Sequence, residues 1–215
     1  MSFMSEAKQK ESNMFSTKDL VDISDKLGII QVVKSKLVNQ PDKAASHLLA
    51  ALEEILKIYL VFESEITKYL ALTLEPDEIG EERATLLDLE SGKIVARMGA
   101  ARGHCGKIFN IYDRYLRAWL KRILDPDENA MMEQLFNQMS LTDSIMLDVI
   151  DEVSNWLATE AEETLNLIDA GDVQAAQQRI RAARITVTPA RRAIAGAMRK
   201  IRDIEADFIE ASKAV

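Results

Sequence analysis

Apolar residues recur along four long stretches of the chain at steps that alternate between four and three positions. These apolar seams run over residues 48–69, 94–119, 135–156 and 173–211. A mean step of 3.5 residues is the period of α-helices that coil around one another with a left-handed twist. The pattern therefore predicts an all-α fold: an elongated antiparallel up-and-down bundle of four long helices, with a shorter N-terminal helix beside them.

Turn and capping residues set the expected bounds of these helices. Pro126 fits the first turn of a helix, Gly171 fits a helix end, and Asp172 fits the N-cap of the helix that follows. Five helices are expected, over residues 16–39, 41–74, 81–124, 126–169 and 173–213. Because the connections between them are short, consecutive helices should run antiparallel.

Two of the expected helices contain a residue that disfavours a straight helix. Ser91 and Gly92 are expected to bend or break the third helix. Pro189 lies inside the fifth, where proline normally kinks or ends a helix. The apolar seam nevertheless continues in phase from Val187 to Ile194, which favours one kinked helix.

The seam of the third helix carries the most unusual side chains. It comprises Ile94, Met98, Ala101, Cys105, Ile108, Tyr112, Tyr115 and Trp119, all of which are expected to face the core. Cys105 should therefore be buried and act as an apolar residue rather than as a reactive thiol.

Bulk composition indicates one globular unit. Residues 1–14 are polar and aperiodic and are expected to form a disordered tail, whereas residues 15–215 are expected to form a single helical-bundle domain. No apolar run approaches the ~20 residues that a membrane span requires. A single cysteine excludes an internal disulfide framework and fits a reducing compartment, so a cytoplasmic protein is expected.

Charge is distributed in blocks along the chain, whose net charge is −8. Residues 93–124 hold eight bases and one acid, residues 125–172 hold thirteen acids and no base, and residues 173–202 hold eight bases and no acid. Helices of opposite sign attract one another, so the acidic segment should lie beside the two basic ones. Its charge would cancel their field, which argues against a nucleic-acid partner.

Small residues form a second stripe on the third helix, also at steps of four and three. The stripe comprises Gly92, Ala96, Gly99, Gly103 and Gly106. Three glycines inside a helix destabilise it by roughly 2–3 kcal/mol relative to alanine, so a compensating contact is expected. Close approach of another backbone, either the first helix or a second subunit, is the leading interpretation. A ligand in the resulting hollow is one alternative, and a loop or a broken helix in this stretch is another. Arg97, Arg102 and Lys107 flank the stripe and could hold an anion.

Arg97 and His104 are separated by six residues. This spacing resembles the loose Arg-x(4–6)-His motif of the helical HEPN ribonucleases, although Met98 replaces the polar residue that commonly follows the arginine in that family. The resemblance implies that the pair would act on an RNA phosphodiester from one shared cleft, across a dimer.

The segment 165–176 has the sequence Leu-Asn-Leu-Ile-Asp-Ala-Gly-Asp-Val-Gln-Ala-Ala. It resembles the hairpin between the last two helices of bacterial four-helix-bundle sensory domains, such as the periplasmic domains of chemoreceptors. The resemblance covers about a dozen residues, and it implies a helix stop, a cap and a close helix crossing. A small-ligand sensor with a pocket near the glycine stripe is therefore one alternative for the function.

Motifs that would identify a reaction are absent from the sequence. There is no Glu-x-x-His pair, no cysteine and histidine spacing typical of metal sites, no phosphate-binding loop and no dinucleotide fingerprint. No catalytic residue, metal or cofactor is therefore expected. The leading interpretation is a non-enzymatic adaptor, regulator or assembly subunit that acts through helix surfaces. Such a protein would bind a protein partner or itself, and the 3.5-residue period permits a homodimer.

Overall fold

The fold is seen in a computed structural model, which describes residues 17–37, 42–140 and 144–213. The predicted all-α class is confirmed, since the described residues contain helices and no strand. The helices are α1 (Thr17–Lys26), α2 (Gly28–Leu37), α3 (Asp42–Leu70), α4 (Ile79–Glu90), α5 (Gly92–Ile111), the π-helix η1 (Tyr112–Leu116), α6 (Arg117–Ile123), α7 (Pro126–Gln138), α8 (Ile145–Asp169), α9 (Val173–Thr186) and α10 (Thr188–Lys213). The predicted tail, residues 1–14, lies outside the described residues.

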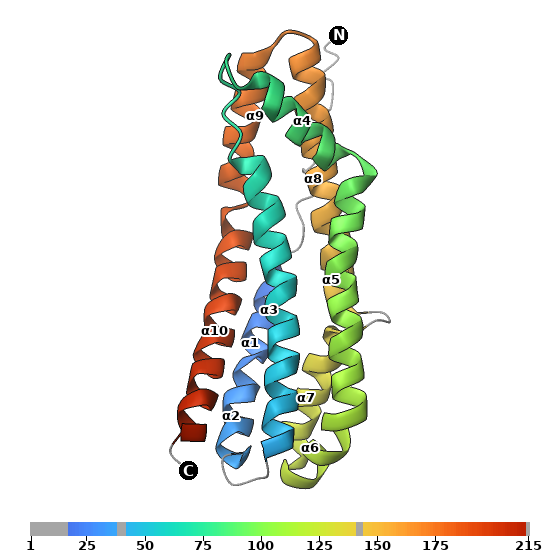
Figure 1. The fold of residues 1–215 in the computed structure, drawn as a ribbon, viewed down its shortest axis with the longest axis vertical. Helices are drawn as coiled ribbons and strands as arrows, with labels where there is room; N and C mark the ends of the chain where they lie inside the picture. Colours follow the sequence, from blue (N-terminus) through green and yellow to red (C-terminus); the bar gives the residue numbers. More distant parts are fainter. Residues whose placement is uncertain (1–16, 38–41, 141–143, 214–215) are drawn as a thin grey trace, which may run out of the picture.

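The long helices lie along the long axis of one elongated molecule, and α4 crosses its upper end obliquely (Figure 1). In that view α3 runs upward, α5 runs downward, α8 runs upward and α10 runs downward. The short helix α1 contacts α10, α7 and α8, so it fills the space between the rods rather than lying outside them. None of the helices in the described ranges is long and apolar enough to cross a membrane.

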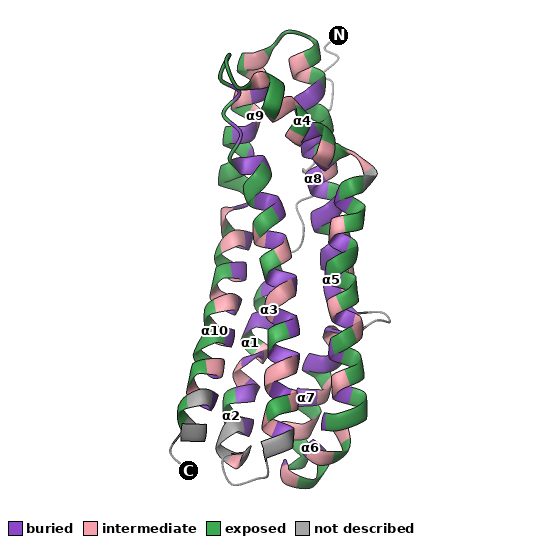
Figure 2. Ribbon diagram, in the orientation of Figure 1, coloured by how far each residue is buried: buried purple, intermediate pink, exposed green. Residues whose placement is uncertain are grey.

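One apolar core runs the whole length of the bundle. The buried positions lie on the inner sides of the helices, as the colouring of Figure 2 shows. The seam of α3 is buried from Leu48 to Tyr69, and the seam shared by α9 and α10 is buried from Ala176 to Phe208. The 3.5-residue period therefore located the inward face of these helices correctly.

Two helices that the sequence presents as continuous are interrupted, and those predictions were wrong. The first divides at Leu27 into α1 and α2, and the fourth divides after Gln138 into α7 and α8. At the second break, the Ser144 hydroxyl accepts a hydrogen bond from the Leu147 amide at 3.1 Å and caps α8. A side chain that caps a new helix competes with continuation of the old one.

The third predicted helix breaks at Ser91, as expected, because Ser91 adopts an extended conformation and caps α5. Further along, the wide turn of η1 inserts one extra residue into the helix. The buried positions after Tyr112 are consequently Leu116 and Leu120. The prediction for Tyr115 was wrong, since its side chain is 51% exposed.

The fifth predicted helix is divided by a single residue, Val187, into α9 and α10. Val187 has a ψ angle of −8°, which is displaced from the helical value, and Pro189 follows in the first turn of α10. The seam continues without a change of phase, because Val187, Ala190 and Ile194 are all buried. The expected single kinked helix is therefore two helices that present one continuous buried edge.

The second predicted helix ends at Leu70, four residues earlier than expected. Residues 71–78 then form the connection to α4, in which Leu72 and Leu74 are buried although they belong to no helix. This connection forms one wall of a cavity described below.

Candidate functional site

The predicted small-residue stripe lies on the side of α5 that points away from the core. Ala96, Gly99 and Gly103 are exposed and define the outer face of α5, and Gly106 is half-buried at its lower edge. A Cβ atom added to Gly99 or to Gly103 would meet no atom within 4 Å. The first helix therefore makes no close approach to these two glycines, while contact with a second subunit or a ligand stays a prediction.

Arg97 and His104 lie on the side of α5 that faces α3, and each binds a different buried carboxylate. Arg97 donates from Nε to Glu65 Oε2 at 2.8 Å, and His104 Nδ1 lies 2.6 Å from Glu54 Oε2. Glu54 and Glu65 are eleven residues apart, or about 16 Å along α3. The structure thus gives both members of the predicted ribonuclease pair a helix-to-helix contact, and RNA cleavage stays an untested prediction.

The other cations that flank the stripe also contact carboxylates. Arg102 forms an ion pair with Asp151 of α8, and Lys107 Nζ lies 3.4 Å from Glu54. Lys93, at the upper end of α5, pairs with Asp88. These contacts leave the middle of the stripe free of charge and place bases along both of its edges.

Glu54 is the electrostatic centre of the contact between α3 and α5. It is 8% exposed, and it accepts a hydrogen bond from Lys57 at 2.8 Å in addition to the contact with His104. Burial alone would raise the pKa of Glu54, but the hydrogen bonds from Lys57 and His104 outweigh it and hold the pKa below its ordinary value. The carboxylate is therefore charged at neutral pH, and it fixes the rotation of α5 against α3.

A second polar cluster, which the sequence analysis did not predict, lies between α3, α8 and α9. The Tyr69 hydroxyl donates to Glu160 Oε2 at 3.3 Å and lies 3.0 Å from Thr164 Oγ1. Arg179 of α9 binds the same Glu160 carboxylate at 3.0 Å. Burial raises the pKa of Glu160, while the positive charge of Arg179 opposes that change.

The backbone of the α3–α4 connection is held by side chains from two helices. The Glu82 carboxylate of α4 accepts from the amides of Thr73 and Leu74 at 2.7 and 2.5 Å. On the other side, Arg184 of α9 donates to the carbonyl oxygens of Leu70 and Leu72 at 2.9 and 3.0 Å. Gln177 of α9 donates to the carbonyl oxygens of the next two residues, 73 and 74.

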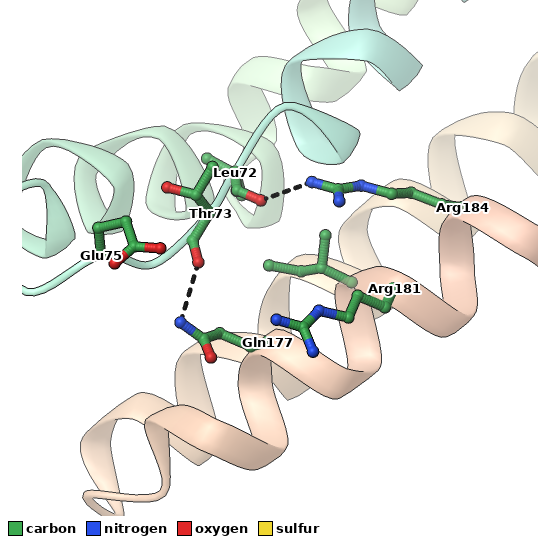
Figure 3. Close-up of a pocket in the computed structure, with 7 residues that line it drawn as sticks. Leu72, Thr73, Glu75, Gln177, Arg181 and Arg184 are labelled. Carbon is green, nitrogen blue, oxygen red and sulfur yellow. Dashed lines mark hydrogen bonds between the residues drawn. The ribbon is translucent and has the colours of Figure 1, made fainter.

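A cavity of about 160 Å³ lies between this connection and α9 (Figure 3). It is lined by Leu72, Thr73, Glu75, Gln177, Ile180, Arg181 and Arg184. Arg184 and Gln177 are engaged by the backbone of the connection, as the dashed lines in Figure 3 show. None of these residues belongs to the stripe on α5, so this cavity is not the pocket that the sensor alternative places there.

Comparisons of the chain with models of protein families, with curated proteins and with solved structures find no match. The geometry of the described residues is therefore what bears on function. Among those residues, no three histidine, cysteine, aspartate or glutamate side chains lie together in a way that could hold a metal ion. Cys105 is buried as expected, and burial raises the pKa of its thiol to about 12.

Sequence reasoning found the stripe and its flanking bases, but it missed the Glu160 cluster. It also missed the clamp on the α3–α4 connection, which consists of the hydrogen bonds that Glu82, Gln177 and Arg184 form with the backbone of residues 70–74. Arg184 and Gln177 lie between 103 and 114 positions from the carbonyl groups that they bind. A contact between a side chain and a distant backbone carbonyl leaves no periodic signal, so only the structure reveals it.

Proposed function

We propose that this chain is a non-enzymatic interaction protein, an adaptor, regulator or assembly subunit, that binds a protein partner through the outer face of α5. The observation that carries the proposal is the openness of this face. Ala96, Gly99 and Gly103 are exposed, and no atom lies within 4 Å of a Cβ added at either glycine.

These glycines lower the stability of the isolated chain. A glycine in the middle of a helix destabilises it by about 1 kcal/mol relative to alanine, because the unfolded chain is freer and no side chain packs. Two such residues with open surroundings lower the stability of the chain, and no contact within its described part compensates for them. A partner helix that approaches closely would make use of the missing side chains.

Chemical character also favours a protein partner. The outer face of α5 carries no charge of its own, and Val95 beside it is 64% exposed. The bases Lys93, Arg102 and Lys107 lie around it. An uncharged centre with a charged rim is the general arrangement of protein interfaces.

The test is site-specific photo-cross-linking in cells. A photoreactive amino acid replaces Gly103 in one variant and Gly196 of α10 in the control, since a Cβ at Gly196 is equally free of neighbours. The expected result is a discrete covalent adduct, to another protein or to the chain itself, at position 103 and not at position 196. Equal labelling at the two positions, or no adduct at position 103, would contradict the proposal.

A further inference from the structure

We infer that the protein that covers the outer face of α5 is a second copy of this chain, which contributes its own helix α8. This inference rests on the proposed function and specifies its partner. In the resulting homodimer, α5 of each copy packs against α8 of the other, around a twofold axis parallel to the helices.

The helices α5 and α8 lie on one side of the molecule and run in opposite directions (Figure 1). They contact each other, and the ion pair between Arg102 and Asp151 joins them. A twofold axis that runs along the bundle between them would place the α8 of the second copy directly over α5. The same rotation would place the α5 of the second copy over α8, so one operation satisfies both helices.

The two helices also carry opposite charge on this side. The exposed residues of α8 include Asp148, Asp151, Glu152 and Glu162, and α8 contains no base. Asp148 and Glu162 form no ion pair within the described part of the chain. The stripe on α5 is bordered instead by Lys93 and Lys107, which are 69% and 60% exposed. A surface with one positive and one negative helix is complementary to its own copy after this rotation.

The heights of the charges on the two helices also agree. Rotation about an axis along the bundle leaves the height of every residue unchanged. The Arg102–Asp151 ion pair places these two residues at similar heights, so counting along α5 and α8 from this pair gives the residues that lie close to level. Lys107 is level with residue 146 of α8, and Lys93 is level with residue 160. Asp148 and Glu162 are each two residues further on, or about 3 Å. Each lysine would therefore lie within reach of an acid on the second copy.

The same arrangement accounts for the glycines. Between Lys93 and Lys107, the outer face of α5 presents the exposed residues Ala96, Gly99 and Gly103, and no atom lies within 4 Å of a Cβ added at either glycine. Larger side chains at these positions would hold the two helices apart and separate the lysines from the acids. Small residues instead permit a short distance between the axis of α5 and that of α8 of the second copy. At that distance the exposed polar side chains of the second copy's α8 can lie across the stripe.

The first experiment measures the mass of the full chain in solution by sedimentation equilibrium, at concentrations up to about 100 µM, where an interface of micromolar affinity is filled. The expected result is a dimer with twice the 24.1 kDa mass of the chain. A Gly103→Glu variant, which adds bulk and a charge of the same sign as α8, should raise the dissociation constant at least about 100-fold. The control Gly196→Glu adds the same side chain to α10 and should leave the dimer intact.

A charge exchange tests the partner helix itself. Lys93→Glu and Glu162→Lys should each weaken the dimer, about 3-fold to 10-fold, by placing like charges at the interface. The two substitutions combined in one chain should restore the dissociation constant, because each copy then offers the opposite arrangement. Circular dichroism of each variant confirms that the helices are retained.

The outcomes separate this inference from the proposed function. A chain that stays monomeric at about 100 µM, or a dimer that Gly103→Glu leaves unchanged, would overturn the inference. An adduct with a different protein at position 103, in place of a self-adduct, would also overturn it while leaving the proposed function in place. If position 103 gives no adduct at all, the proposed function fails with it.

Discussion

Two buried tyrosines of α3, Tyr59 and Tyr69, provide a test of how polar groups are accommodated in the core. Both side chains are 0% exposed. The Tyr69 hydroxyl contacts Glu160 and Thr164, whereas the Tyr59 hydroxyl has no hydrogen-bond partner among the described residues. Burial raises the pKa of both phenols, so both remain neutral over the ordinary pH range. Replacement by phenylalanine removes only the hydroxyl and should therefore have opposite effects at the two positions.

The magnitudes follow from what each hydroxyl loses on folding. A buried hydroxyl without a partner costs about 1–3 kcal/mol, and the small cavity that its removal leaves offsets part of the gain. Tyr59→Phe should therefore raise the free energy of unfolding by about 1 kcal/mol. Tyr69→Phe breaks the contacts with Glu160 and Thr164 and leaves a buried acceptor short of one donor, which should lower the free energy of unfolding by about 1–3 kcal/mol.

Urea unfolding followed by circular dichroism measures both effects, with equal slopes expected for all three proteins because the surface exposed on unfolding is unchanged. The corresponding shift in Tm is about 2–4 °C for each kcal/mol in a chain of this size. If Tyr59→Phe lowers the free energy of unfolding by more than about 1 kcal/mol, its hydroxyl has a hydrogen-bond partner and the reasoning is refuted.

Three further predictions concern other parts of the bundle. Since the folded state holds the pKa of Glu54 below its ordinary value, Glu54 stabilises the fold at pH values above that ordinary pKa and loses this effect as the pH falls through the folded-state pKa. Glu54→Gln should reduce the loss of stability between neutral pH and about pH 3, as measured by urea unfolding at both. Glu82→Ala should accelerate hydrogen exchange at the amides of Thr73 and Leu74, and unchanged exchange would show that Glu82 does not hold them. Gly171 has a φ angle of +80°, so Gly171→Ala should lower the free energy of unfolding by about 1–2 kcal/mol, and thermal unfolding at the usual Tm would contradict this.

The inward face of the helices could be predicted from the sequence because burial follows the helical period. Leu48, Ile94 and Ile201 lie in three different helices, and all are buried as expected. The period reports which side of a helix is apolar, and it is insensitive to a break that keeps the phase. For that reason the seam located Val187 and Ala190 correctly while it concealed the division between α9 and α10.

The change of phase in η1 could not be predicted in the same way. The period of the seam selects Tyr115, but Leu116 is also apolar enough for the core, and nothing in the sequence marks the extra residue that exchanges the two. Which of the two residues is buried depends on contacts with other helices. The ring of Tyr112 stacks on that of Phe136 of α7, and the ring of Tyr115 stacks on that of His47 of α3, with ring centroids 4.4 Å apart in each pair. These pairings favour an extra residue in the turn, which places Tyr115 outside the core and Leu116 inside it.

The candidate site was only partly accessible from the sequence for a related reason. The spacing of Gly99 and Gly103 identified an unusual helix face, and the period places it away from the apolar seam, but the sequence could not show whether another helix covers it. Openness around a glycine depends on what neighbouring helices leave uncovered, which is a property of the assembled bundle.

The clamp on the α3–α4 connection has a practical consequence for anyone who wishes to label or fuse this protein. Surface connections usually accept tags and insertions because water can satisfy their peptide groups. Here the side chains of Glu82, Gln177 and Arg184 form hydrogen bonds with six peptide groups between residues 70 and 74. A longer connection would move these peptide groups away, so both they and the three side chains would lose their hydrogen-bond partners. Reporter domains are better attached elsewhere, and a protein engineered at this connection would be expected to lose the upper end of its bundle first.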